Sequence, residues 1–213
     1  MRGLYLVTPD WHDTAKLIDI TEQALAGGAS LVQYRNKTAD AALRYEQAVQ
    51  LQALCRRYVR PFIVNDFVKL CVELDADGVH VGAADTPVAA IRSAIGNDKI
   101  IGATCYGDLE IARQAWQAGA SYVAFGGFYP SPVKNYPVTT SPGIVNQAKA
   151  QITLPLAVIG GMTAENARPL LAAGADMVAV ISSIYLAKDP LTATRDFVTL
   201  FDAAVSADRI VDE

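Results

Sequence analysis

Cysteine and histidine are scarce in this chain of 213 residues, and each shortage excludes a class of protein. The cysteines are Cys55, Cys71 and Cys105, an odd number with no CxxC pair, so we expect a reducing compartment and no disulfide framework. The two histidines, His12 and His80, are too few for a typical zinc site. Neither a disulfide-rich nor a zinc-dependent protein is expected.

Long apolar runs and an excess of positive charge are also missing. The runs at 154–159 and 177–181 are far shorter than the roughly 20 residues that span a bilayer. The start of the chain, 1–8, lacks the apolar core of a signal peptide. Because the net charge is -4, no nucleic-acid partner is expected. We expect a cytoplasmic protein that binds small molecules, and its association into a homo-oligomer stays open.

Strand-like and helix-like segments alternate along the whole chain. The hydrophobic fraction of 52% suits one soluble domain with a single large core, spanning 1–213 with a frayed polar tail at 206–213. The expected strands are 4–8, 31–34, 62–64, 78–81, 100–104, 122–126, 156–159 and 177–181. The expected helices are 14–26, 40–57, 67–74, 89–95, 109–118, 144–149, 164–173 and 191–205.

Eight strand and helix pairs predict a single-domain TIM (β/α)8 barrel. Four junctions resemble one another, namely Gly28-Ala29-Ser30, Asp75-Ala76-Asp77, Gly119-Ala120-Ser121 and Gly174-Ala175-Asp176. Their spacing of about two units suggests a barrel built from similar quarters. A doubly wound open sheet is the competing architecture. The barrel is favoured because no GxGxxG fingerprint and no linker to a second domain are present.

Acidic residues follow two central strands. Asn65 and Asp66 come directly after the strand at 62–64, and Asp85 follows the strand at 78–81. In a parallel sheet these strand ends meet at one edge, so two carboxylates there could share Mg²⁺. The alternative is that Asp66 and Asp85 cap the helices that follow their strands.

Basic residues follow other strands and would reach the same edge. Alternation sends Gln33 and Arg35 to one side of their strand, with Lys37 just beyond it. The loop GGFYPSPVK at 126–134 adds Ser131 and Lys134 as phosphate contacts. Together with a metal, these cations suit a diphosphate. The alternatives are solvated side chains and a loop that only connects.

Two later strand ends indicate a second anion site. Ile159-Gly160-Gly161-Met162 and Ile181-Ser182-Ser183 follow the seventh and eighth strands, where barrels often bind phosphate through backbone N–H groups. Standing alone, the two glycines would equally indicate a simple turn. His80 points either to the core or to the mouth of the barrel.

Taken together, the motifs resemble those of the thiamine-phosphate synthase family in order and approximate spacing. They are Gln33-x-Arg35-x-Lys37, Asn65-Asp66, GVHVGAAD ending at Asp85, Tyr129-Pro130-Ser131-x-x-Lys134, Ile159-Gly160-Gly161 and Ile181-Ser182. The likeness runs from Leu4 to about Lys188. It implies a transferase of the TIM barrel type that joins hydroxymethylpyrimidine diphosphate to a carboxylated thiazole phosphate. The products would be thiamine monophosphate, diphosphate and carbon dioxide.

The resemblance also assigns roles to single residues. It implies that Asp66 and Asp85 bind Mg²⁺. It also implies that the catalytic cations holding the departing diphosphate are Arg35, Lys37 and Lys134. The residues for the pyrimidine diphosphate are Gln33, Tyr34, Arg35, Asn36, Lys37, Asn65, Thr104 and Lys134. Those for the thiazole phosphate are Ser131, Pro132, Val133, Gly161, Ile181 and Ser182.

Two of these positions depart from the family's usual residues. Thr104 stands where the family often has Ser, so the hydroxyl is retained. Val133 stands where the family often has Thr, so one side-chain donor to the thiazole half is lost. Whether the loop at 126–142 closes over substrate stays open.

The expected mechanism is dissociative, because the cations stabilise the leaving diphosphate and no protein nucleophile is required. Three rivals are weighed against it. A thiazole tautomerase of the same fold would handle no diphosphate, and the joint presence of five residues argues against it: Gln33, Arg35, Lys37, Asp66 and Asp85. A non-catalytic phosphate-binding barrel finds support only in Val133. A lyase using Lys134 as a Schiff base lacks the apolar burial that lowers the pKa of lysine.

Overall fold

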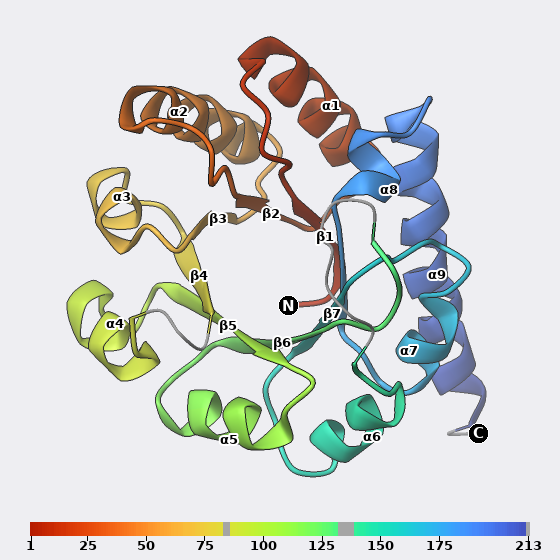
Figure 1. The fold of residues 1–213 in the computed structure, drawn as a ribbon. Helices are drawn as coiled ribbons and strands as arrows, with labels where there is room; N and C mark the ends of the chain where they lie inside the picture. Colours follow the sequence, from red (N-terminus) through yellow and green to blue (C-terminus); the bar gives the residue numbers. More distant parts are fainter. Residues whose placement is uncertain (83–85, 132–138, 212–213) are drawn as a thin grey trace.

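The computed structural model describes residues 1–82, 86–131 and 139–211, with side chains through Asp202. Eight parallel strands form a closed barrel in which each strand pairs with the next and the last pairs with the first (Figure 1). The strands are β1 (Gly3–Val7), β2 (Leu31–Tyr34), β3 (Phe62–Asn65), β4 (Gly78–Gly82), β5 (Ile100–Tyr106), β6 (Tyr122–Gly126), β7 (Leu156–Ile159) and β8 (Met177–Val180). The predicted TIM barrel is confirmed, and the competing open sheet is wrong.

Helices surround the barrel (Figure 1). They are α1 (Thr14–Ala26), α2 (Ala41–Arg57), α3 (Val68–Glu73), α4 (Val88–Ile95), α5 (Leu109–Gln117), α6 (Gly143–Lys149), α7 (Arg168–Ala172), α8 (Ser182–Tyr185) and α9 (Pro190–Val211). Helix α7 starts four residues later than predicted because Thr163 and Asn166 exchange side-chain to backbone hydrogen bonds that form a turn instead. No helix within the described ranges is both long and apolar enough to cross a membrane.

Strand alternation divides the buried side chains into two layers. Outward-facing residues such as Val79 and Val81 of β4 belong to the large cluster between the sheet and the helices. Inward-facing residues fill the barrel itself, and their apolar members are Tyr5, Val7, Leu31, Ile63, Tyr122, Ala124, Ala157, Met177 and Ala179. The inward residues nearest the C-terminal ends of the strands therefore form the floor of any site at that end.

The four similar junctions share one backbone structure. In each, an alanine N–H donates to the carbonyl five residues earlier, at 2.9 to 3.0 Å, as in a Schellman helix end. The residue before that alanine has a left-handed φ in all four cases: Gly28 (105°), Asp75 (49°), Gly119 (95°) and Gly174 (103°). The recurring sequence is thus a repeated way of ending a helix and entering a strand.

Candidate active site

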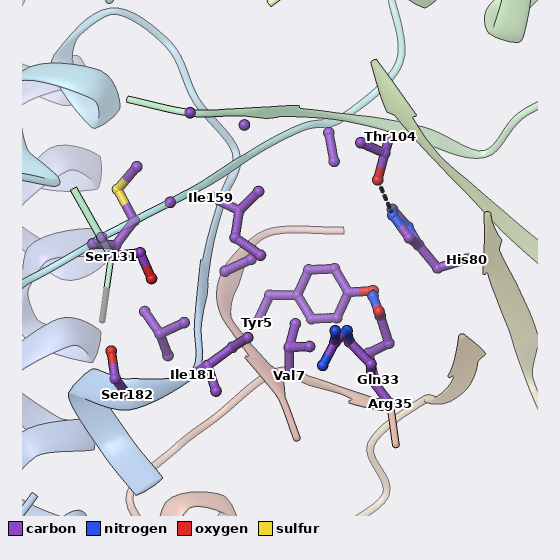
Figure 2. Close-up of a pocket in the computed structure, with 18 of the residues that line it drawn as sticks. Tyr5, Val7, Gln33, Arg35, His80, Thr104, Ser131, Ile159, Ile181 and Ser182 are labelled. Atoms are coloured by element: carbon purple, nitrogen blue, oxygen red, sulfur yellow. Dashed lines mark hydrogen bonds between the residues drawn. The ribbon is translucent and has the colours of Figure 1, made fainter. Parts of the chain in front are cut away.

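A pocket of about 150 Å³ opens at the C-terminal ends of the strands. Tyr5, Val7, Ala124 and Ala179 contribute an apolar floor, and polar side chains from the strand ends form the rim. Figure 2 shows Ser131 and Ser182 on one side of the pocket, with His80 and Thr104 on the other. The pocket therefore has two polar ends separated by an apolar middle.

The end of β2 supplies two of the predicted residues. Gln33 and Arg35 both line the pocket, as alternation predicted. The Arg35 side chain is 10% exposed, and its Nη1 donates to Asp10 Oδ2 at 2.7 Å. Its Nε is buried and has no hydrogen-bond partner among the residues that the structure describes. An unpaired buried donor costs about 1–3 kcal/mol, so an acceptor on a bound ligand would stabilise this N–H.

Asp10 organises the loop after β2, and the sequence analysis did not single it out. Besides Arg35, its carboxylate accepts the backbone N–H of Lys37, with Oδ1 2.6 Å from the nitrogen. One carboxylate thus fixes the start of the loop that carries Arg35 and Lys37, two of the three predicted cations. The position of Asp10 just beyond the first strand, in LYLVTPD, was the available signal.

Asp66 lies at the end of β3 in a strained backbone conformation. Its φ of 61° is left-handed, a region that costs most residues other than glycine roughly 1–2 kcal/mol and that Asp adopts more readily than most. Helix α3 is preceded by Phe67 and has no side-chain cap, so the alternative that Asp66 caps this helix is wrong. Its Oδ2 instead lies 3.2 Å from Lys37 Nζ. Strained polar residues of this kind cluster at functional sites.

Of the two carboxylates predicted to bind Mg²⁺, the structure describes Asp66, while Asp85 lies outside the described residues. Within the described part of the chain, no three His, Cys, Asp or Glu side chains come together as a metal cage. Mg²⁺ needs no such cage, since it keeps water and phosphate oxygens as ligands and uses one or two carboxylates. A carboxylate at the strand ends, held beside Lys37, is a hard oxygen donor of the right kind.

Tyr34 and Asn36 have side chains that support the loop. Tyr34 is buried outside the barrel, and its hydroxyl donates to Gln47 Oε1 at 3.0 Å. Asn36 Nδ2 donates to the Trp11 carbonyl at 2.8 Å, and Asn36 Oδ1 accepts the Ala39 N–H at 3.0 Å. Neither residue lines the pocket. A contact of either with substrate stays a prediction.

Asn65, Thr104 and His80 complete this end of the pocket. The Thr104 hydroxyl lies 2.7 Å from His80 Nε2 (Figure 2). His80 is 6% exposed, so it is a buried residue of the barrel interior that also reaches the site. Below it lie Tyr5 and Tyr122, which the sequence analysis missed and which burial keeps neutral by raising the pKa of each.

The opposite end of the pocket is built from β7 and β8. Gly161 has a φ of 60°, and a Cβ at this position would lie 2.1 Å from the Pro130 carbonyl oxygen. No larger residue fits without moving the loop, which is the backbone approach expected of a phosphate site. Ser131, Ile181 and Ser182 line the same end. The other predicted residues of this loop, Pro132, Val133 and Lys134, lie outside the described residues.

The comparisons with known proteins agree with this geometry. The family model described as thiamine monophosphate synthase matches residues 4–184, which is most of the chain. The chain belongs to the thiamine monophosphate synthase family. The matched span contains every pocket-lining residue and every predicted site residue. The resemblance noted from the motifs is therefore confirmed.

Individual relatives place the chain well inside the thiamine monophosphate synthase family. A thiamine-phosphate synthase of Janthinobacterium sp. is 65% identical over 201 residues, covering 94% of this chain and 97% of the relative. That of Methylobacillus flagellatus is 48% identical over 203 residues, covering 95% and 96%. Both relatives are named thiamine-phosphate synthase, which is a transferase, so the predicted enzyme class is confirmed.

Solved structures agree with the family and the barrel. A thiamine phosphate pyrophosphorylase from Pyrococcus furiosus superimposes with a TM-score of 0.83 at 31% identity, over 95% of this chain and 96% of that one. A 3-hexulose-6-phosphate synthase superimposes with a TM-score of 0.69 at 16% identity, over 94% and 99%. The second likeness shows the shared barrel fold alone.

Proposed function

We propose that this chain joins 4-amino-2-methyl-5-(diphosphooxymethyl)pyrimidine to 2-(2-carboxy-4-methylthiazol-5-yl)ethyl phosphate, giving thiamine monophosphate, diphosphate and carbon dioxide. The observation that carries the proposal is the buried Arg35 guanidinium at the pocket, with one N–H lacking a partner in the described structure, in a chain of this family. A diphosphate would supply the missing acceptor.

The pyrimidine end of the pocket would hold the first substrate. Gln33, Asn65 and Thr104 line the pocket, and their amide and hydroxyl groups would contact the ring. Arg35 and Lys37, with Lys134 from the loop, would bind the diphosphate as catalytic residues. Tyr34 and Asn36 would complete the contact by holding this loop in place.

Bond breaking at the pyrimidine CH₂ places negative charge on the departing oxygen. The carbon–oxygen electron pair stays with the diphosphate, and the aminopyrimidine delocalises the positive charge that remains. Cations fixed before the reaction stabilise that charge separation without reorganising. The thiazole nitrogen lone pair then forms the new carbon–nitrogen bond. The carboxylate leaves as carbon dioxide, and the ring carbon that carried it takes a proton.

Asp66 and Asp85 would hold Mg²⁺ beside this diphosphate. When bound, the ion would neutralise charge on the phosphate oxygens. Lys37 pairs with Asp66, which supports a role for its ammonium group beside the metal, where it would bind the same diphosphate. This arrangement would keep the cation close to the leaving group.

The thiazole end would hold the second substrate by its phosphate. Ser131 and Ser182 contribute hydroxyls, Gly161 and Ile181 contribute backbone at close range, and Pro132 and Val133 would continue the same loop. The apolar middle of the pocket would bring the two rings together, and their proximity would supply much of the remaining rate enhancement.

A cytoplasmic location is proposed because the three cysteines are buried and unpaired. Association into a homo-oligomer stays a prediction.

The test is a thiamine phosphate assay with both substrates, with and without Mg²⁺. We expect metal-dependent product, and about a 100-fold or larger loss of kcat/KM in Arg35→Ala, which corresponds to roughly 2.7 kcal/mol of lost transition-state stabilisation. Asp19→Asn, on the exposed surface of α1, is the matched control and should keep full activity. Product formation unaffected by Arg35→Ala would overturn the proposal.

A further inference from the structure

A continuous line of hydrogen bonds crosses the barrel beneath the pyrimidine end of the pocket. Gln33 Nε2 donates to the Tyr5 hydroxyl at 2.5 Å, and the Tyr5 and Tyr122 hydroxyls lie 2.5 Å apart. The Tyr122 hydroxyl lies 2.8 Å from His80 Nδ1, and His80 Nε2 lies 2.7 Å from Thr104 Oγ1. We call these five side chains the relay. Its two ends, Gln33 and Thr104, line the pocket.

The barrel is shaped around the relay. Tyr5, Tyr122 and His80 are 1%, 0% and 6% exposed, so water does not separate them. The His80 and Tyr122 rings stack at 5.5 Å with 25° between their planes. A Cβ on Gly102 would lie 2.2 Å from the Tyr122 hydroxyl and 2.4 Å from His80 Nδ1. Glycine at this inward position of β5 leaves the space that the pair occupies.

The direction of the relay follows from counting donors. Gln33 Nε2 can only donate, so the Tyr5 oxygen accepts from it. Among the described residues, the Tyr5 hydroxyl has one other hydrogen-bond partner, Tyr122, and its own proton therefore goes there. Burial raises the pKa of both tyrosines, so each hydroxyl keeps a proton to donate.

Counting donors in the same way gives the direction of the hydrogen bonds from Tyr122 to Thr104. The Tyr122 proton goes to His80 Nδ1, which must then be the unprotonated nitrogen. His80 Nε2 carries the ring proton and donates it to Thr104 Oγ1. The Thr104 hydroxyl accepts from His80 and keeps its own proton to donate into the pocket. At the Gln33 end, the amide nitrogen is held by Tyr5, so the amide cannot turn over without breaking the relay.

We propose that His80, Tyr122 and Tyr5 are positioning residues that fix the hydrogen-bonding polarity of the pocket, with Thr104 as a donor and Gln33 Oε1 as an acceptor, and so select an aminopyrimidine over its oxo analogue. This rests on the proposed function. An aminopyrimidine offers an amino donor beside a ring-nitrogen acceptor, which matches that polarity. The 4-oxo analogue offers a carbonyl acceptor beside a ring N–H, which reverses it.

The first test determines the direction of the hydrogen bonds in the relay from the tautomer of His80 in the ligand-free protein. The chain has two histidines, His12 and His80, so ¹⁵N-histidine labelling gives two sets of ring signals, and His12→Gln assigns them. We expect His80 to be the neutral Nε2–H tautomer at neutral pH. An Nδ1–H tautomer or an imidazolium would overturn the proposal. This result does not depend on turnover, so it stays separate from a failure of the proposed reaction.

The second test measures ligand selectivity. Calorimetry gives the dissociation constants of the aminopyrimidine diphosphate and of its 4-oxo analogue. We expect the native chain to prefer the amino compound by at least about 100-fold, because a reversed polarity leaves buried groups unpaired. Tyr122→Phe keeps the ring and removes the hydroxyl, and it should reduce the preference to below about tenfold and mix the His80 tautomers.

The matched control for this test is Tyr185→Phe. Tyr185 is also buried, and its hydroxyl lies 2.8 Å from Thr21 Oγ1, away from the pocket. We expect this variant to keep the native preference and the native tautomer. A preference unchanged in Tyr122→Phe, or one reduced equally in both variants, would overturn the proposal.

Discussion

At the scale of single residues, the site depends on side chains that hold others in place. Asp10 contacts both Arg35 and the backbone of Lys37, and it does not line the pocket itself. Its negative charge would repel a diphosphate, while its two hydrogen bonds orient the cations that attract one. Replacing Asp10 tests which effect is larger: KM rises if orientation of the cations matters more, and it falls if charge repulsion matters more.

We predict that Asp10→Asn weakens binding of the pyrimidine diphosphate, with KM rising about tenfold, or roughly 1.4 kcal/mol. The reason is that a buried guanidinium without its carboxylate no longer keeps one geometry. Steady-state kinetics measures the change. A lower KM would show that the charge matters more than the orientation.

Asp13→Asn is the control for Asp10→Asn, because it removes the same charge from the same loop. Asp13 caps helix α1 by accepting the Lys16 N–H at 3.0 Å. Asparagine is a comparable cap, so this variant should keep both its KM and its stability.

At the scale of elements, the four similar junctions show how a short pattern specifies local structure. Each needs a left-handed residue to end its helix, and three of the four use glycine for it. Asp75 is the exception, and its Oδ1 forms an exposed ion pair with Lys99 Nζ. Asp accepts the left-handed region better than most residues, which accounts for its use here.

We predict that Gly119→Ala lowers the free energy of unfolding by about 1–2 kcal/mol, since alanine is strained at a φ of 95°. The contact with Arg92 contributes little, because an added Cβ would lie 3.4 Å from its nearest atom, Cγ. Urea denaturation measures the loss. Gly119→Asn should cost less than alanine because asparagine tolerates this region, and equal losses would contradict the backbone explanation.

At the scale of the whole molecule, the closed barrel buries all three thiols between the sheet and the helices. Cys55, Cys71 and Cys105 are unpaired and belong to the large outer cluster. Burial raises the pKa of these thiols to about 12, 11 and 12, from an ordinary value of 9.0. At pH 8 only roughly one thiol in 10³ to 10⁴ is then the reactive thiolate.

We predict that the folded chain does not react with Ellman's reagent at pH 8, and that all three cysteines react once it is unfolded in denaturant. Because burial raises the pKa of these thiols in the folded chain, the stability that the buried, protonated thiols contribute is present below about pH 9. That stability is lost as the pH rises through the thiol pKa values of the folded chain. Absorbance of the released thiolate at pH 8, with and without denaturant, measures the difference. Fast reaction of one thiol in the folded protein would contradict this burial.

The sequence by itself determined the barrel and most of the rim of the site. Strand alternation placed Gln33 and Arg35 at the pocket, and turn residues marked the strand ends that carry Asn65 and Gly161. These features depend on spacing within one segment, where backbone geometry alone decides which way a side chain points. The frayed tail and the individual site roles stay predictions.

Only the tertiary structure decided which distant side chains meet. Tyr5 and Tyr122 are 117 residues apart, and Asp10 and Arg35 are 25 apart. Their contacts depend on barrel closure and on the register between strands, which a single segment does not encode. Alternation could place His80 on one of two sides, and the closed barrel then gave it Tyr122 and Thr104 as partners. The polarity of the pocket is therefore a property of the assembled barrel, because it exists only once those strands lie side by side.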